Sequence, residues 1–221
     1  MSNNVVITGA NRGIGLAMTK HFKTQGDNVF ALCRKTNTEL NSLGVKVIEQ
    51  IDVATEVGIN NMCAALNHVN IDVLVCNAGI LRDESIVNLN LDTIREQFEV
   101  NAIAPLNIVA QLQGQLRNGA KVALITSRMG SIADNGSGGR YGYRMSKAAL
   151  NAAAMSLKHD LASKEVSVGI YHPGYVQTDM VNYGGDISAN ESARRLVNLI
   201  NQLTIAESGV FKHSNGETLP W

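Results

Sequence analysis

The 221-residue sequence lacks the features that mark secreted, membrane-bound or nucleic-acid-binding proteins. Its 19 basic residues balance its 19 acidic ones, so no net charge draws the chain to nucleic acid or to an anionic membrane. The N-terminus shows no basic region, apolar signal core or cleavage site, and no apolar run is long enough to span a bilayer. These absences predict a cytoplasmic protein without a nucleic-acid or membrane partner.

Cysteine is also scarce. Cys33, Cys63 and Cys76 are odd in number, scattered and without C-x-x-C spacing, which predicts reduced, mostly buried thiols rather than a disulfide framework or a metal site. Internal repeats, low-complexity tracts and linkers are absent too. A chain that is 45% hydrophobic and 17% charged is long enough for one substantial core, so we expect a single domain over residues 1–221.

Short runs rich in β-branched residues recur along the chain, and most are separated by enough residues for a helix. Several runs are apolar on both sides, as parallel strands covered on both faces must be. The pattern predicts an α/β fold with a doubly wound parallel sheet of the Rossmann type, helices on both faces, and ligands at the carboxyl ends of the strands. The expected strands are 5–8, 28–32, 45–49, 72–76, 121–126 and 166–171.

A glycine-rich turn with the spacing G-x-x-x-G-x-G follows the first expected strand. Glycines let the backbone turn tightly and approach a pyrophosphate, whose charge suits the N–H groups at a helix N-terminus. The spacing differs from the general dinucleotide fingerprint, and an ordinary tight turn would use similar residues, but the position between a strand and a helix favours nucleotide binding. The turn contains Gly9, Asn11, Arg12, Gly13, Ile14 and Gly15.

The residues after the second expected strand indicate which dinucleotide would bind. A dehydrogenase that prefers NAD usually offers a carboxylate to the ribose 2′-OH at this point. This chain offers Arg34 and Lys35 instead. Either Arg12 or Arg34 alone would also fit a solvated surface, but two guanidinium groups together suit a 2′-phosphate. Their joint placement favours NADP over NAD.

Tyr143 and Lys147 are four residues apart at the start of an Ala-rich run that predicts a helix. At about 100° per residue they lie roughly 40° apart, on one helix face. A phenol with a pKa of about 10 is a poor proton donor at about pH 7 unless a cation, here Lys147, stabilises the phenolate. Tyr141 points elsewhere. This spacing is also common on solvent-facing helices, so it gains meaning only from the other motifs.

Taken together, these motifs resemble the short-chain dehydrogenase/reductase family from end to end. The matching pieces are the glycine turn, Asn77-Ala78-Gly79, Asn101, a serine after the fifth expected strand, Tyr143 with Lys147, and Pro173-Gly174-x-Val176-x-Thr178. More narrowly, 127–132, 135–139 and 141–144 are similar to the C-factor and Sniffer-type carbonyl reductase branch.

The resemblance implies that three later segments complete the cofactor site. The first, Asp52-Val53, contacts the adenine. The second, Asn77-Ala78-Gly79, flanks the adenine ribose and supports the sheet. The third, from Pro173 and Gly174 to Val176 and Thr178, holds the nicotinamide amide and the phosphate. Tyr143 and Lys147 also border the cofactor, Lys147 through the ribose hydroxyls.

The resemblance also implies a catalytic tetrad of Asn101, Ser127, Tyr143 and Lys147. A carbonyl that accepts a hydride becomes an alkoxide and needs a hydrogen-bond donor and a proton source. Ser127 would donate to the substrate oxygen and Tyr143 would supply the proton, with its pKa lowered by Lys147 and by the oxidised nicotinamide. Asn101, in a long helix interrupted by Pro105, would hold a water linking Lys147 to solvent. Without the other motifs, a polar residue satisfying its own helix would explain Asn101.

Two serines compete for the catalytic position. Ser127 precedes Tyr143 by sixteen residues, somewhat more than in most relatives, whereas Ser131 precedes it by twelve. Ser127 directly follows the expected strand 121–126, so its hydroxyl should emerge at the ligand edge. The Gly-rich segment 135–139 can absorb the extra length as a loop. We therefore expect Ser127 to be the catalytic serine.

The sequence says less about the substrate. Only ten residues, 179–188, separate Thr178 from the next helical run, so a short lid should leave an open, apolar and permissive pocket. We expect an NADPH-dependent reductase of small aldehydes or ketones. The alternatives are a C-factor-like signalling or interaction protein, which would need neither Ser127 nor Tyr143, and an NADP-binding protein without physiological turnover.

Two further expectations concern surfaces. The helical runs 106–116 and 148–161 carry apolar and small residues on more of their circumference than one sheet face can cover. Family resemblance points the same way, and we expect a homodimer or homotetramer. The single tryptophan, Trp221, should pack on a protein surface rather than take part in catalysis.

Overall fold

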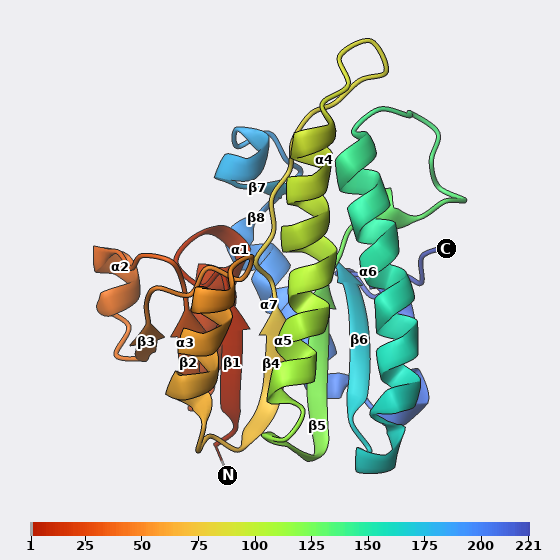
Figure 1. Cartoon of the computed structure of the whole chain (residues 1–221). Helices are drawn as coiled ribbons and strands as arrows, with labels where there is room; N and C mark the ends of the chain where they lie inside the picture. Colours follow the sequence, from red (N-terminus) through yellow and green to blue (C-terminus); the bar gives the residue numbers. More distant parts are fainter. Residues whose placement is uncertain (1) are drawn as a thin grey trace.

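The computed structural model describes residues 2–221. Seven parallel strands form one sheet in the order β3-β2-β1-β4-β5-β6-β9, with helices on both faces (Figure 1). The predicted doubly wound α/β fold is therefore confirmed. The strands are β1 Asn4–Thr8, β2 Asn28–Leu32, β3 Lys46–Ile48, β4 Ile71–Cys76, β5 Leu116–Ile125, β6 Ser167–His172 and β9 Phe211–His213.

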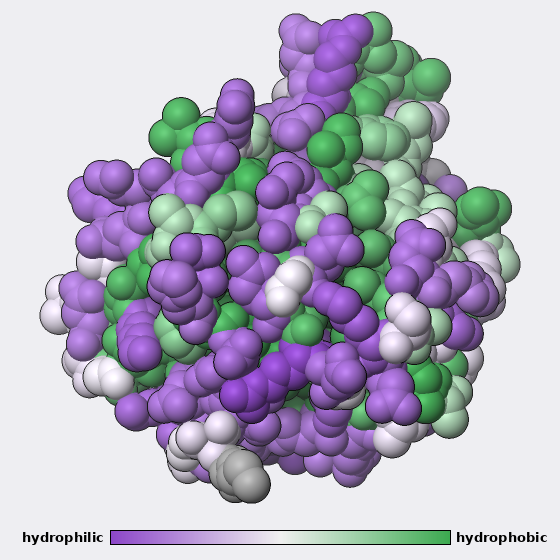
Figure 2. Space-filling view, turned by 60° about the horizontal axis from the view of Figure 1, so that its bottom comes forward, coloured by the Kyte–Doolittle hydropathy of each residue, from purple (hydrophilic) through white to green (hydrophobic). Residues whose placement is uncertain are grey.

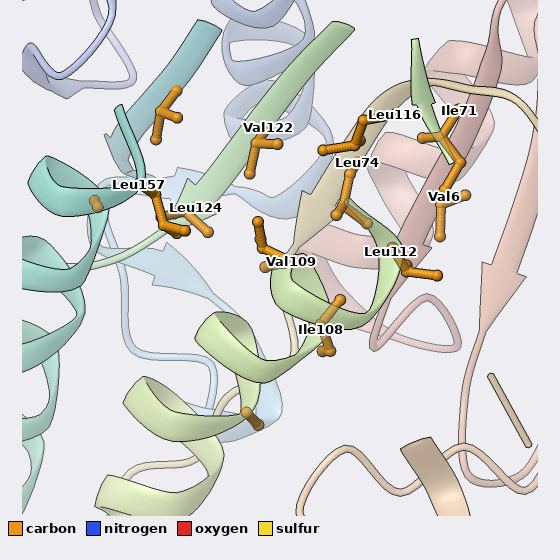
Figure 3. Close-up of a cluster of buried hydrophobic side chains, with 14 of the residues drawn as sticks. Val6, Ile71, Leu74, Ile108, Val109, Leu112, Leu116, Val122, Leu124 and Leu157 are labelled. Carbon is orange, nitrogen blue, oxygen red and sulfur yellow. The ribbon is translucent and has the colours of Figure 1, made fainter. Parts of the chain in front are cut away.

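Two apolar layers cover the two faces of this sheet. Three helices pack on one face: α3 (Glu56–Leu66), α5 (Ala104–Leu112) and α6 (Tyr141–Asp160). Two others, α1 (Gly13–Thr24) and α7 (Ala189–Gln202), cover the opposite face. The strands are apolar on both sides because each face meets a helix layer. Figure 3 shows the first layer, in which Val6, Leu74, Val122 and Leu124 from the strands meet Ile108, Leu112 and Leu157 from the helices.

Strands β5 and β9 differ from expectation. β5 begins at Leu116, before the expected start at residue 121, because its pairing with β4 shifts register between Ile71 and Val73. The exposed residues 117–119 form a bulge within the strand, at which Gly119 has a positive φ. β9 was not predicted because it has only three residues, two of them polar.

The long helix near Asn101 is interrupted one turn before Pro105, not at it. α4 (Leu91–Phe98) passes through a π-helical turn at Glu99–Ile103 into α5, whose first turn contains Pro105. Pro105 lacks the N–H that an α-helix would direct to the Asn101 carbonyl four residues earlier. The π-helical turn accommodates the missing hydrogen bond. The helix is therefore interrupted one turn before Pro105, whereas the sequence placed the interruption at Pro105 itself.

The remaining elements are short. They are α2 (Thr38–Asn41), the pair of β7 (Val176–Gln177) and β8 (Ile187–Ser188) on the two sides of the lid, and short 3-10 turns at Arg128–Gly130, Ala162–Lys164, Asp179–Val181 and Ile205–Glu207. Trp221 stacks on Phe211 with 5.4 Å between the ring centroids, as expected for a packing role. Hydrophilic and hydrophobic residues are interspersed over the face in Figure 2. Within residues 2–221, no helix is both long and apolar enough to cross a membrane.

Candidate active site

A cleft of about 420 Å³ lies at the carboxyl edge of the sheet. It opens between β1 and β4, where the strand order changes direction and the following loops diverge. The cleft brings together most residues that the sequence predicts for the cofactor and for catalysis. Those residues are Gly9, Asn11, Arg12, Gly13, Ile14, Arg34, Asp52, Val53, Asn77, Ala78, Gly79, Tyr143, Lys147, Pro173 and Thr178.

Three predicted cofactor residues stand behind the cleft instead of lining it: Gly15, Gly174 and Val176. A Cβ at Gly15 would overlap the Gly9 carbonyl oxygen and lie 2.6 Å from Nδ2 of Asn77, so this glycine serves the close packing of α1 on the sheet. Gly174 has a φ of 98°, which favours glycine. Val176 is buried in the strand that leads into the lid.

Hydrogen bonds between the carboxyl ends of β1 and β4 hold together the two loops that form the base of the cleft. The Thr8 hydroxyl accepts from the backbone N–H groups of Asn77 (3.0 Å) and Ala78 (3.1 Å). The Asn77 side chain donates to the Thr8 carbonyl at 3.0 Å. A Cβ at Gly9 would lie 3.0 Å from Cα of Ala78, so the first glycine admits the β4 loop. These contacts hold the glycine turn against Asn77-Ala78-Gly79.

The two predicted phosphate-binding arginines lie at the cleft but differ in their partners. Arg34 follows β2 and is exposed. Arg12 pairs with Asp179 of the lid at 3.1 Å, in contact with solvent. Hydrogen bonds from Tyr183 and Arg12 lower the pKa of Asp179. An exposed pair of this kind is weak, so the remaining guanidinium donors can serve a phosphate. Lys35 lies outside the lining residues.

α6 carries the predicted catalytic pair into the cleft. Tyr143 and Lys147 are 9% and 4% exposed, and Nζ of Lys147 lies 5.8 Å from the centre of the Tyr143 ring. The ammonium group donates to the Ile125 carbonyl at 2.9 Å, at the end of β5. The i, i+4 geometry therefore holds as predicted, with the phenol and the amine both buried on the cleft side of one helix.

Burial moves the two pKa values in opposite directions because it disfavours both charged forms. It raises the pKa of Tyr143, an effect that the Ser127 hydroxyl and the Arg140 charge partly offset. It lowers the pKa of Lys147 to about 8. The expected lowering of the Tyr143 pKa by Lys147 stays a prediction, since the cation that acts on the phenol in this arrangement is Arg140.

The neighbours of the two candidate serines favour Ser127. Its hydroxyl lies beside Tyr143 and accepts from the backbone N–H of Met129 at 3.1 Å, so its proton remains available to donate. Ser131 instead donates to the Trp221 carbonyl at 3.0 Å. Ser127 does not itself line the cleft, but its hydroxyl contacts the phenol of Tyr143, which does. The Gly-rich segment 135–139 loops outward, as expected.

Asn101 also lies behind the cleft lining, where its side-chain amide is fully engaged. Its Oδ1 accepts from Ile80 N–H and its Nδ2 donates to the Ile80 carbonyl, both at 2.9 Å, and Nδ2 also donates to Ser146 Oγ at 3.1 Å. Asn101 thus links the loop after β4 to α6. The backbone carbonyl of Asn101 receives no α-helical hydrogen bond, because Pro105 lacks an N–H. This carbonyl, and not the side chain, is the group that could accept a hydrogen bond from the predicted water.

Several lining residues escaped sequence reasoning. Ile80 directly follows the predicted Gly79 and was within reach, whereas Asp179 and Met180 fall in the predicted lid 179–188. Others are brought to the cleft only by tertiary structure; these are Glu96 of α4 and Val100 of the following π-helical turn. Met180 and Tyr183 are 40% and 67% exposed, which agrees with a short lid over an open site. In the part of the chain that the structure describes, no group of three His, Cys, Asp or Glu residues could hold a metal ion.

Comparison with known proteins assigns the family. A family model described as short chain dehydrogenase matches residues 3–187, so the chain belongs to this family. It is 35% identical to the 1-hydroxy-2-glutathionyl-2-methyl-3-butene dehydrogenase of Rhodococcus sp. (strain AD45), over 99% of this chain and 100% of that protein. It is 39% identical to C-signal of Myxococcus xanthus, over 68% of this chain and 93% of that protein.

Solved structures agree with this assignment. The NADPH-bound carbonyl reductase from chicken fatty liver has a TM-score of 0.90 and 27% identity, covering 100% of this chain and 99% of that one. The carbonyl reductase Sniffer of D. melanogaster has a TM-score of 0.88 and 26% identity, covering 100% of both chains. The predicted resemblance to the C-factor and Sniffer branch is confirmed by these similarities.

The two serines can be separated by matched substitutions. Ser127→Ala should lower kcat for NADPH-dependent reduction of a test aldehyde by about 10²- to 10³-fold, the usual cost of removing one donor to a developing oxyanion. Ser131→Ala should leave kcat near the wild-type value because its hydroxyl is bonded to Trp221. Steady-state kinetics of the two variants decides the matter, and a larger loss for Ser131→Ala would reverse the assignment.

Proposed function

We propose that this chain is an NADPH-dependent carbonyl reductase of small aldehydes or ketones, working in the cytoplasm as one NADP-binding domain over residues 1–221. The observation that carries the proposal is that Tyr143, which lines the cleft, has both the Ser127 hydroxyl and the Lys147 ammonium beside it. The cofactor, when bound, supplies the hydride that adds to the carbonyl carbon.

The protein groups then handle the oxygen and its proton. The Ser127 hydroxyl donates a hydrogen bond to the carbonyl oxygen, and Tyr143 transfers its phenolic proton to the same oxygen as negative charge develops there. Burial favours the protonated phenol, the form that a donor requires. Lys147, whose pKa is lowered to about 8, returns a proton to Tyr143 and regains one from solvent through a water held at Asn101. The reverse route oxidises an alcohol.

The residues present fit NADP. The glycine turn leaves room for a pyrophosphate at the N-terminus of α1. Asp52, Val53, Asn77 and Thr178 all line the cleft, which is where the family resemblance expects contacts to the adenosine and to the nicotinamide end. Arg12 and Arg34 supply two guanidinium groups for a 2′-phosphate. The solved chicken carbonyl reductase, which has NADPH bound, is a neighbour of the same fold and supports the choice.

The cofactor preference can be measured directly. NADPH should bind more tightly than NADH, and Arg34→Ala should remove about tenfold or more of that preference, since a hydrogen bond to a charged group contributes roughly 1.5–3 kcal/mol. Lys35→Ala is the matched control, because it removes a neighbouring cation outside the cleft lining. Fluorescence titration of both cofactors gives the Kd values; equal affinities in the wild type would refute the NADP assignment.

A second candidate function comes from the 39% identity to C-signal. In this alternative the chain is an NADP-bound signalling or interaction protein with little physiological turnover. The buried Ser127–Tyr143 pair argues against it, because binding alone needs neither hydroxyl. The Rhodococcus relative, named for dehydrogenation of a glutathionyl alcohol, supports turnover and suggests that bulky substrates could enter the open lid. A panel of aldehydes, ketones and alcohols assayed with both cofactors would separate the two candidates.

The proton donor is tested by removing a single oxygen. Tyr143→Phe should abolish carbonyl reduction while fold and NADPH affinity stay nearly intact, whereas Tyr141→Phe should have a mild effect. A positioned acid contributes about 10² to 10⁴ in rate, so the two variants should be far apart. The measurement is kcat against pH with one aldehyde. In the wild type, kcat should fall as pH rises through the raised pKa of Tyr143; wild-type turnover by Tyr143→Phe would refute the role.

We also propose a homodimer or homotetramer. Ile103, Leu106 and Met145 are 49%, 42% and 49% exposed on the adjoining π-turn, α5 and α6. Light scattering at micromolar concentration should give a multiple of the chain mass. Leu106→Glu should reduce that mass, because a charge would have to be buried at the interface, whereas Ile205→Glu, at an apolar residue exposed elsewhere, should not. A monomeric wild type would refute the proposal.

A further inference from the structure

The helix that carries Tyr143 begins without a cap of its own. Arg140 occupies the N-cap position of α6 in the left-handed conformation, with a φ of 50°. In the described chain its side chain makes no capping hydrogen bond, and the first turn of α6 contains no acidic residue. The first N–H groups of a helix have no partner within it. An unfastened start would leave the position of Tyr143, in that same first turn, poorly defined.

The missing cap comes from Glu84, in the loop after β4. This carboxylate is 3% exposed, and its Oε2 accepts from the backbone N–H of Gly142 at 3.3 Å. Its own carbonyl accepts from the backbone N–H of Arg140 at 2.8 Å. A negative group at a helix N-terminus also complements the helix dipole. Glu84 therefore bonds the residues on both sides of the start of α6.

Glu84 is in turn held by α4. Its Oε1 accepts from the Thr93 hydroxyl at 2.7 Å and from Nε2 of Gln97 at 2.6 Å. Gln97 is fully buried, and a Cβ at Gly142 would overlap its amide nitrogen, so only glycine allows α4 and α6 to approach here. One carboxylate thus accepts three hydrogen bonds from two helices, which fixes the start of α6 relative to α4.

We infer that Glu84 is a positioning residue for the reaction: it fixes the first turn of α6 so that the Tyr143 hydroxyl meets the Ser127 hydroxyl and the substrate oxygen. The inference rests on the proposed role of Tyr143. Glu84 lies outside the residues that line the cleft and acts only through α6. The adjacent ion pair of Arg140 with Asp83, at 3.2 Å, keeps the Arg140 charge at the same helix start.

The test replaces the carboxylate by its isosteric amide. Glu84→Gln turns one acceptor into a donor, which must face either Gly142 N–H or the Thr93 and Gln97 donors. We expect kcat to fall by about tenfold to hundredfold, as misplacement by about 1 Å can cause, with the Kd for NADPH unchanged. Backbone amide exchange at Gly142, followed by NMR, should become faster. Asp92→Asn is the matched control: it neutralises an exposed acid in the first turn of α4 and should change none of these values.

The outcomes separate this inference from the proposed function. Wild-type kcat in folded Glu84→Gln, whatever its Tm, would refute the positioning role. If Tyr143→Phe, assayed in parallel, kept full turnover, the proposed function itself would fail. Should Glu84→Gln not fold, Thr93→Val removes one of the three donors; an intermediate loss of kcat with faster Gly142 exchange supports the role, and unchanged kcat refutes it.

Discussion

The hydrogen bonds between Thr8 and Asn77 are the constraint on which the site depends. They join the ends of β1 and β4 where the strand order changes direction, and so set the width of the crevice between two loops. A narrow crevice leaves no room for side chains in the glycine turn, which explains both Gly9 and Gly15. Without this fastening, the turn and the β4 loop would diverge like ordinary surface loops. The glycine pattern is therefore a consequence of the strand junction as much as of the ligand.

Burial is the second physical effect that shapes the site, because the same low-dielectric pocket shifts the pKa values of an acid, Tyr143, and of a base, Lys147. A raised Tyr143 pKa keeps the phenol neutral, and a Lys147 pKa of about 8 puts the amine near its point of proton exchange at physiological pH. The difference between the two pKa values alone would make return of a proton from Lys147 to Tyr143 favourable. Phenolate formation, in contrast, needs additional positive charge beside the ring. The cations available from the protein are Arg140 at the helix start and Lys147 below the ring.

The sequence predicts the central sheet, the glycine turn and the Tyr143–Lys147 face because each depends on local periodicity and spacing. The later segments of the cofactor cleft were expected only because the chain resembles a known family. The sequence could not predict β9, whose three residues carry no pattern, or the bulge in β5, which depends on pairing with the distant strand β4. The π-turn at Asn101 was displaced from the expected bend because the effect of Pro105 falls on a carbonyl four residues earlier. Glu84 was overlooked for a different reason: it acts on a helix 58 residues away in sequence, and no local pattern records that contact.

The two ends of the cleft are built from different kinds of structure. The cofactor end is made of strand termini, buried amides and helix N-termini, so a few residue types specify it closely. The substrate end is bounded by the exposed lid residues Met180 and Tyr183 and by an Arg12–Asp179 pair open to solvent. Relatives with the same scaffold carry names of different substrates, including a glutathionyl alcohol. A shared scaffold thus does not specify the substrate. A substrate for this chain has to be sought through the contacts of the lid, since the catalytic groups alone distinguish only the reaction.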